Sequence, residues 1–351
     1  MIENVIEKLF KDSGLGKTDQ PITPVPGGFM HRMYKVHAGD KYYAVKHLNP
    51  GVMARESAAE NFDKADALET IIEEAGIPIV PSLVLNGQKR QCIDGNFFYV
   101  FNWQEGRITD WNNITCNQCY KVGNILGRIH SLNCAETEIK IAEESAIDWE
   151  EYVHKAEKEN NAISDILSEN ISLLKYAEGQ LNAARKSLPA ICCISNEDMD
   201  PKNVMWNNNE PIVIDLECLD YGNPVSHVLQ LSLQWAGITT CNINQSLVKA
   251  FFEGYFAAYD NGFRAYETVF GLAYTWVEWL EYNICRALGA GADETECVMG
   301  VTEVKSTIKR MQYLFQKEKE IKDVFEQLKD GRHKSERNEA GRLNNCLECP
   351  G

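Results

Sequence analysis

The sequence predicts an α+β protein with two lobes, a small β-rich N-terminal lobe and a larger, mainly helical C-terminal lobe. The first hundred residues mix short β-prone runs with helix-prone segments, whereas helical periodicity dominates the chain from residue 117 onward. No internal repeat of roughly 20–50 residues is visible, which disfavours a solenoid or a propeller. At 351 residues the chain is also long enough to bury two separate cores.

Residues 1–103 are expected to form the N-terminal lobe. Charged and apolar residues alternate at helical spacing over 2–13, which predicts an opening helix. A second helix is expected over 55–75, because helix formers are dense there and Gly76 followed by Pro78 is a stop signal. β-prone residues bounded by turn-forming residues predict strands at 33–36, 42–45, 82–85 and 97–103.

The remaining chain up to residue 330 is expected to form the C-terminal lobe, residues 104–330. Its expected elements are a helix at 120–132, a helical pair within 144–187, β-like runs at 190–194 and 211–216, and four helices from 224 onward. Residues 331–351 carry few apolar side chains, so we expect a mobile tail there.

The chain is strongly acidic, with 51 acidic against 35 basic side chains and a formal net charge of −16. This balance disfavours nucleic acid or an anionic membrane as a partner, since both need a basic face. It is compatible with a cationic small substrate, because an acidic cleft concentrates cations. Surface acidity that serves only solubility explains the same charge.

The sequence predicts a cytoplasmic protein. No stretch approaches the roughly 18 apolar residues of a membrane helix. The opening residues MIENVIEKLFKDSG lack the basic region and apolar run of a signal peptide. The 12 cysteines are therefore expected to be reduced thiols. Two Cys-x-x-Cys pairs, Cys116/Cys119 and Cys346/Cys349, lie too far apart for a zinc ribbon, although a redox or metal role of the terminal pair stays open.

The strongest functional signal is the segment Asp198-Met-Asp-Pro-Lys-Asn203, which is followed twelve residues later by Asp215. This order suits phosphoryl transfer: Asp198 orients or deprotonates a hydroxyl group, while Asn203 and Asp215 offer oxygens to a cation that bridges phosphates. So few hard oxygen ligands suit Mg²⁺, which keeps waters and takes further ligands from phosphate. A polar turn between two strands explains the Asp-to-Asn spacing alone, but not the Asp at the end of the next strand.

Two further motifs lie upstream. Lys46 interrupts the apolar run Tyr43-Ala-Val-Lys46, and a lysine there is unfavourable unless a phosphate or carboxylate meets its charge. The run is similar to the V-A-I-K strand of protein kinases. The alternative is an edge-strand lysine that faces solvent. Ahead of it, Pro26-Gly27-Gly28-Phe29 offers glycine amides that approach phosphate oxygens closely, although by itself it is only a turn signal.

Taken in chain order, these motifs resemble the aminoglycoside phosphotransferase and choline kinase group of small-molecule kinases. The resemblance covers about residues 24–224, in the segments PVPGGFMHRMYKV, YYAVKHLNP, EEAGIPIVP, VFNWQEGR, VGNILGRIHSLN, ISNEDMDPKNVMW and IVIDLECLDYGNP. The later WVEWLEYNICRAL is similar to that group's C-terminal helices. The resemblance implies a bilobal protein-kinase-like fold. It also implies ATP- and Mg²⁺-dependent phosphate transfer to a hydroxyl group, with GTP as an alternative donor.

Carried over by position, the resemblance implies a role for each matching residue. Asp198 would be the catalytic base, Asn203 and Asp215 the magnesium ligands, and Lys46 the residue that binds the α- and β-phosphates. The other nucleotide contacts would come from the phosphate loop and from the backbone at the adenine edge, namely Gly27, Gly28, Phe101, Asn102 and Trp103. The acid that pairs with Lys46 is expected on the 55–75 helix, where Asp66 is preferred over Glu60.

Three positions depart from the group's usual pattern. Asn196 stands where a His usually precedes the catalytic Asp, His227 where a structural Asp is usual, and His31 where the glycine loop often carries Asn. None of these changes removes a group expected to touch the metal or the transferred phosphoryl group. The alternative function that they leave open is a non-catalytic nucleotide-binding protein on the same fold.

The phosphate acceptor is expected to be a small molecule with a hydroxyl group, and an amino sugar, an aminoglycoside or a choline-like cation is favoured. Glu217 is a candidate for contact with metal or substrate, and otherwise faces solvent. Glu278 and Glu281 are candidate contacts for a cation, whereas the neighbouring Trp276 and Trp279 are expected in the core. The sequence gives no prediction of the oligomeric state.

Overall fold

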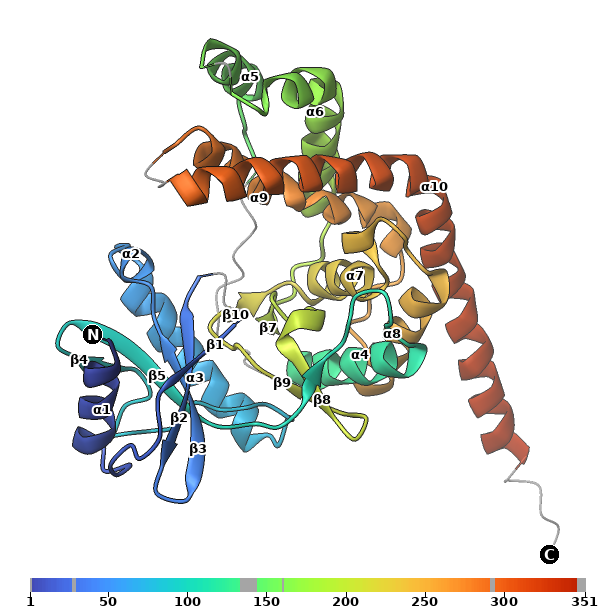
Figure 1. The fold of residues 1–351 in the computed structure, drawn as a ribbon. Helices are drawn as coiled ribbons and strands as arrows, with labels where there is room; N and C mark the ends of the chain where they lie inside the picture. The colour runs from blue at the N-terminus through green and yellow to red at the C-terminus, as the bar shows by residue number, and fades with distance from the viewer. Residues whose placement is uncertain (1, 27–29, 133–143, 160, 291–293, 346–351) are drawn as a thin grey trace, which may run out of the picture. The chain divides into compact units, whose positions relative to one another are not determined.

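The chain forms two compact units. The computed structural model describes residues 2–26, 30–132, 144–159, 161–290 and 294–345, with side chains described up to residue 328. The first unit combines Met1–Thr109 with Asn196–Asp220, and the second combines Asp110–Ser195 with Tyr221–Gly351. Figure 1 shows the course of the chain. The sequence predicts a boundary after residue 103 and assigns 196–220 to the helical lobe, whereas the structure groups those residues with the N-terminal strands.

The first unit is built around a five-stranded antiparallel sheet in the order β1-β2-β3-β5-β4. Its strands are β1 (Thr23–Val25), β2 (Arg32–Ala38), β3 (Lys41–His47), β4 (Gln91–Ile93) and β5 (Asn96–Asn102). A tight turn joins β2 to β3, and Gly39 in this turn has a φ of 65°, which glycine adopts without strain. In the central pair of strands, Val45 lies opposite Val100 and Lys46 opposite Tyr99.

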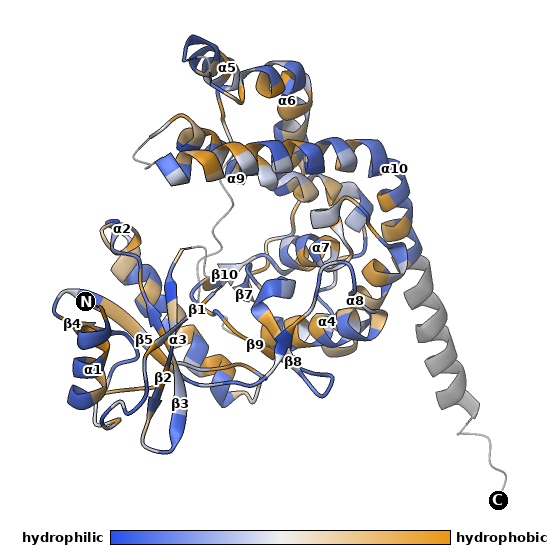
Figure 2. Ribbon diagram, viewed as in Figure 1, coloured by the Kyte–Doolittle hydropathy of each residue, from blue (hydrophilic) through white to orange (hydrophobic). Residues whose placement is uncertain are grey.

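A helix packs on each face of this sheet. Apolar residues of β2, β3 and β5 form one core cluster with α1 (Ile2–Asp12), and β5 is coloured mostly as hydrophobic in Figure 2. Tyr99, on the other face, packs with Phe62 of α3 (Ala58–Glu74). Successive side chains of a strand point to opposite faces. Val45 therefore enters the α1 cluster, and Lys46 lies on the α3 side.

Residues 196–220 join the first unit through backbone hydrogen bonds. Three short strands form a second sheet in the order β6-β8-β9, with bounds β6 (Arg107–Ile108), β8 (Val204–Asn207) and β9 (Glu210–Val213). The Val80 amide donates to the Val213 carbonyl at 2.9 Å, and the Val213 amide donates to the Pro78 carbonyl at 2.8 Å. These bonds are the reason why this segment belongs with the N-terminal strands.

The second unit is mainly helical. Its helices are α4 (Cys116–His130), α5 (Trp149–Lys158), α6 (Ser164–Lys186), α7 (Pro224–Trp235), α8 (Gln245–Ala258), α9 (Trp276–Ala287) and α10 (Glu294–Asn345). The strands β7 (Cys193–Asn196) and β10 (Leu219–Gly222) form a two-stranded sheet. Helices α4 and α8 cross closely through glycines. A Cβ at Gly123 would lie 2.1 Å from the Phe251 carbonyl oxygen, and one at Gly254 would lie 1.9 Å from the Tyr120 carbonyl oxygen.

The structure confirms the predicted α+β class, with a small antiparallel sheet near the N-terminus and a larger helical part. Some elements differ from the prediction. Residues 82–85 carry only isolated bridges, and β4 and β8 form where the sequence predicts no strand. Helix α10 continues to Asn345 where a tail is predicted from 331, because its Glu, Arg, Lys and Ala residues favour helix. Residues 346–351 lie outside the described residues. No helix among those described is long and apolar enough to cross a membrane.

Candidate functional site

The Asp198 side chain is held through both of its carboxylate oxygens. It lies between β7 and the 3-10 helix η1 (Pro201–Asn203), which begins where Asp200 Oδ1 accepts the Lys202 amide at 3.0 Å. This turn brings Lys202 Nζ to 2.8 Å from Asp198 Oδ1 and Asn203 Nδ2 to 2.9 Å from Asp198 Oδ2. Because the 3-10 turn lies between Asp198 and Asn203, it folds the chain back and brings the two side chains into contact.

The surroundings of Asp198 suit a group that receives a proton. Burial raises the pKa of Asp198, the charge of Lys202 opposes this rise, and the nearby Asp215 carboxylate adds to it. The side chain is still 33% exposed, so a hydroxyl group from solvent can reach it. The fully buried Asn196 accepts the Asp198 amide at 3.1 Å through its side-chain oxygen. Asn196 therefore fixes the loop from the position where the resembling group usually has His.

Asn203 and Asp215 are brought together by the backbone. The Ile214 amide donates to the Asn203 carbonyl at 2.9 Å, and the next residue, Asp215, has a φ of 61°, in the left-handed region where few non-glycine residues occur. Asn203 uses its side-chain nitrogen on Asp198, which leaves its side-chain oxygen free to face a cation. Such strained positions are concentrated at functional sites.

The donor set of this site fits Mg²⁺. Asn203 and Asp215 offer hard oxygen ligands, and Mg²⁺ accepts one or two protein ligands when phosphate and water complete its shell. In the described part of the chain, no group of three or more His, Cys, Asp or Glu side chains is placed to hold a metal ion. A cation at Asn203 and Asp215 would therefore depend on the phosphates of a nucleotide.

Lys46 is almost completely buried, with 6% of its surface exposed. Its Nζ atom donates to Asp215 Oδ1 at 2.5 Å and to Glu217 Oε2 at 2.6 Å. Burial alone would lower the pKa of Lys46, but the charges of Asp215 and Glu217 outweigh it and raise the pKa above the ordinary value. Lys46 thus remains charged, and it joins β3 to the segment that carries Asp215.

The expected partner of Lys46 on α3 is not the one found. Among the described residues, neither Asp66 nor Glu60 forms an ion pair with Lys46, since its Nζ atom is held by Asp215 and Glu217. Asp66 lines the same pocket, and burial raises the pKa of its carboxyl group to about 6. Glu60 is exposed.

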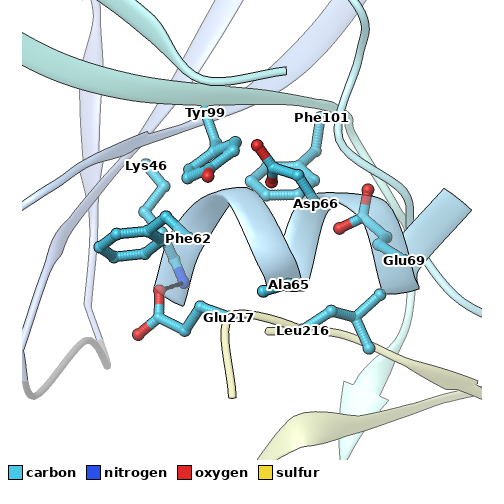
Figure 3. Close-up of a pocket in the computed structure, with 9 residues that line it drawn as sticks. All are labelled: Lys46, Phe62, Ala65, Asp66, Glu69, Tyr99, Phe101, Leu216 and Glu217. Carbon is cyan, nitrogen blue, oxygen red and sulfur yellow. Dashed lines mark hydrogen bonds and ion pairs between the residues drawn. The ribbon is translucent and has the colours of Figure 1, made fainter. Parts of the chain in front are cut away.

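Figure 3 shows the pocket beside Lys46. Residues of β3, β5, α3 and the segment after β9 line it, namely Lys46, Phe62, Ala65, Asp66, Glu69, Tyr99, Phe101, Leu216 and Glu217. Lys46 points toward Glu217 in this view, while Asp66 and Glu69 lie farther along α3. The pocket therefore combines apolar and aromatic walls with one buried cation and three carboxyl groups.

Glu69 pairs with other residues than Lys46. Its Oε1 atom accepts the Ser82 amide at 2.8 Å, the Ser82 hydroxyl at 2.7 Å and Lys89 Nζ at 2.8 Å. Glu69, Ser82 and Lys89 are all buried. This cluster attaches α3 to the chain that follows it.

The structure describes three of the five other residues predicted to contact the nucleotide. Phe101 lines the pocket, and Asn102, which ends β5, is exposed. The Trp103 amide donates to the Tyr42 carbonyl at 3.1 Å, so that amide is already used within the sheet region. Gly27 and Gly28 lie outside the described residues, as do Cys346 and Cys349.

The acidic residues predicted for a cationic substrate lie in the second unit. Arg185 donates to both oxygens of Glu278, at 2.7 and 3.0 Å, so the charge of Glu278 is already matched. Glu281 accepts the Tyr152 hydroxyl at 3.0 Å and has a neutral partner. Trp279, predicted in the core, is instead 39% exposed.

His227 belongs to a buried polar chain of the second unit. Its Nδ1 atom contacts the Ser195 hydroxyl, which also lies 3.2 Å from His130 Nε2. His130 Nδ1 in turn lies 2.9 Å from the Tyr255 hydroxyl. Burial lowers the pKa of His130, so His130 takes part in this chain as a neutral ring. His227 therefore has a structural role in the position where the resembling group has Asp.

Sequence reasoning missed two features of the site. Lys202 stands inside the quoted motif, and its i, i+4 spacing from Asp198 is a signal for the observed ion pair. His31 is noted above only as a departure, yet its Nε2 atom lies 3.0 Å from Glu217 Oε1. No local pattern indicates that contact, because the two residues are distant in sequence.

Comparison with known families decides the class of the protein. Residues 21–289 match the phosphotransferase enzyme family, APH. The chain belongs to this phosphotransferase family. A search by sequence among curated proteins finds no match.

Solved structures similar to this phosphotransferase include several kinases. Spectinomycin phosphotransferase APH(9)-Ia, in complex with ADP and spectinomycin, aligns with a TM-score of 0.66 at 14% identity, over 88% of this chain and 97% of that one. A choline/ethanolamine kinase family protein from Mesorhizobium loti aligns with a TM-score of 0.62 at 13% identity, over 93% and 100%. Amicoumacin kinase hAmiN, in complex with AMP-PNP, Ca²⁺ and Ami, gives 0.58 at 13% identity, over 88% and 96%.

These likenesses confirm the predicted fold, which is that of aminoglycoside phosphotransferases and choline kinases. The family match confirms that the phosphotransferase is an enzyme of the kinase class. The roles of its individual residues remain predictions.

Proposed function

We propose that this phosphotransferase moves the γ-phosphoryl group of ATP to a hydroxyl group of a small molecule in a Mg²⁺-dependent reaction. The observation that carries the proposal is that one unit brings four residues together. Lys46 bonds Asp215, Asn203 bonds Asp198, and Ile214, the residue before Asp215, bonds the Asn203 carbonyl. Similar structures contain ADP, AMP or AMP-PNP, which supports a nucleotide donor. GTP is the alternative donor.

In the proposed reaction Asp198 orients the acceptor hydroxyl and accepts its proton as the oxygen attacks the γ-phosphorus. The bond from that phosphorus to the bridging oxygen breaks, and the nucleoside diphosphate leaves with the electron pair. Lys46 supplies positive charge to the phosphates of the nucleotide. Asn203 and Asp215 would hold magnesium, which neutralises developing charge on the phosphate oxygens when it is bound.

We propose a cationic acceptor of the amino sugar, aminoglycoside or choline-like class. The net charge of −16 supports it. Similar structures include a protein bound to spectinomycin and a choline/ethanolamine kinase family protein. Glu281 is a better candidate contact than Glu278, because Arg185 already neutralises Glu278. The proposed location is the cytoplasm, with no nucleic acid or membrane partner.

A transfer assay with ATP and Mg²⁺ across an acceptor panel tests the proposal. The panel holds aminoglycosides, amino sugars, choline, ethanolamine, methylthioribose, nucleosides and homoserine. Asp198→Ala should abolish transfer, while Asp40→Ala, in the exposed turn between β2 and β3, is the matched control and should retain it.

Nucleotide binding without transfer to any acceptor, and without ATP hydrolysis that depends on Asp198, would contradict the proposal. That result would favour the non-catalytic nucleotide-binding alternative, which Asn196 and His227 motivate.

A further inference from the structure

We propose that Glu217, rather than an acid of α3, positions Lys46 for the phosphates of the nucleotide, and that His31 holds Glu217 in place. The inference deepens the proposed function and rests on it for the identity of the ligand. It assigns a shared role to Glu217 and His31, whose roles the sequence motifs do not define.

Glu217 bridges two segments of the first unit with one carboxylate. Its Oε2 atom accepts Lys46 Nζ at 2.6 Å, and its Oε1 atom accepts His31 Nε2 at 3.0 Å. Glu217 therefore has a cationic partner on one oxygen and a hydrogen-bond donor on the other.

The hydrogen bonds of His31 fix its tautomer. The Asn49 amide donates to His31 Nδ1 at 3.0 Å, so this nitrogen carries no proton. The proton of the neutral ring is then on Nε2, which faces Glu217. With 7% of its surface exposed, His31 is a fixed donor beside the start of β2. It therefore restrains the Glu217 side chain without needing a charge.

Two other acids are poorer candidates for this role. Asp215 also contacts Lys46, at 2.5 Å, but it is the carboxylate proposed to face a divalent cation. Two cations that share one carboxylate repel each other, so Asp215 becomes a weaker partner for Lys46 when a cation is present. Among the described residues, the side-chain partners of Glu217 are Lys46 and His31. On α3, Glu69 is held by Ser82 and Lys89.

The geometry leaves Lys46 able to bind phosphate. An ammonium group has three N–H donors. Asp215 and Glu217 take two of them, and the third is free to face a phosphate oxygen. The Glu217 contact holds the Nζ atom beside Asp215, at the metal end of the site.

The pairing is tested without nucleotide by the rate at which Lys46 reacts with acetic anhydride, followed by peptide mass mapping. Only the neutral amine reacts, so loss of the carboxylate that stabilises the ammonium form raises the rate. We expect Glu217→Gln to raise it about tenfold, the equivalent of one pKa unit. Asp66→Asn should raise it less. Glu73→Gln, on the exposed side of α3, removes the same charge as a matched control and should leave the rate unchanged.

A faster reaction in Asp66→Asn than in Glu217→Gln would overturn the proposal. Thermal unfolding checks that each variant is folded. If Glu217→Gln does not fold, His31→Leu is the second variant, because it removes the donor to Glu217 Oε1 but keeps the Lys46 carboxylate. It should give a smaller increase in the rate, and an unchanged rate would contradict the role of His31.

Calorimetric titration with MgADP then measures the positioning role. Glu217→Gln should weaken MgADP binding about tenfold, or about 1.4 kcal/mol. Unchanged MgADP binding in a folded Glu217→Gln variant would overturn the positioning role. Neither readout requires phosphate transfer. A blank acceptor panel would therefore count against the proposed function alone, whereas an unchanged Lys46 reactivity would count against this inference alone.

Discussion

Helix α3 is attached to its unit by a buried ion pair, and breaking that pair should destabilise the fold strongly. Glu69 Oε1 accepts three hydrogen bonds, two from Ser82 and one from Lys89. Lys89 Nζ also donates to the Asp66 carbonyl at 3.1 Å. Glu69→Ala would leave the Lys89 ammonium group buried without its carboxylate and the Ser82 amide without its acceptor.

The size of the effect follows from burial. Glu69 and Lys89 are 6% and 8% exposed, so water cannot replace the lost partner easily. Removal of one member of a buried ion pair typically costs about 3–5 kcal/mol, and we expect that range for Glu69→Ala. Replacing both charges, in Glu69→Leu with Lys89→Met, leaves no unpaired charge. The double variant should therefore be more stable than Glu69→Ala, although the Ser82 bonds remain lost.

Urea unfolding followed by tryptophan fluorescence measures these free energies. Glu73→Ala, exposed on the same helix, is the matched control and should change the free energy of unfolding by less than about 0.5 kcal/mol. The reasoning is refuted if Glu69→Ala behaves like this control, or if the double variant is as unstable as the sum of its two single variants.

Three further predictions concern the loop, the helix crossing and pH. Lys202→Met should lower kcat by about tenfold or more with a smaller change in the KM for ATP, because the Asp198 carboxylate loses one of its two side-chain partners. An unchanged kcat in steady-state assays would contradict this. Gly254→Ala should destabilise by about 1–3 kcal/mol or more in thermal unfolding, whereas Gly179→Ala, with open space beside it on α6, should not destabilise. Burial raises the pKa of Asp66 to about 6 in the folded chain, above its unfolded value, so the contribution of Asp66 to stability should be lost as pH rises from about 4 to 6. Asp66→Asn should remove that loss and gain about 1–2 kcal/mol over the wild type at pH 7, discounted for partial exposure, and an equal gain at pH 3 would refute the assignment.

The sequence predicts which of the proposed site residues lie close together where that proximity depends on local spacing. One 3-10 turn links Asp198 to Asn203, and Asp215 follows two residues after the end of β9, so both placements can be inferred from residue order. The partner of Lys46 could not be predicted in this way. The partner depends on which acidic side chains already have other partners. Glu69, for example, is bonded to Ser82 and Lys89.

The missed strands have local signals that their short length obscures. Asn208 and Asn209, with φ of 50° and 65°, form the turn that joins β8 to β9. Asp94 and Gly95, with φ of 50° and 77°, form the turn between β4 and β5. Asn-Asn and Asp-Gly pairs are turn signals. Strands of three or four residues, however, are too short for alternation to be recognised in the sequence.

The most direct measurement of the central claim compares turnover with nucleotide affinity in Asp198→Asn. The account predicts that kcat falls by about 10²–10⁴-fold, because the variant cannot accept the hydroxyl proton. It also predicts that MgATP binding by calorimetry stays close to that of the wild type, since Lys46, Asn203 and Asp215 are unchanged. Turnover that persists while MgATP binding is lost would contradict the assignment of Asp198 as the catalytic base.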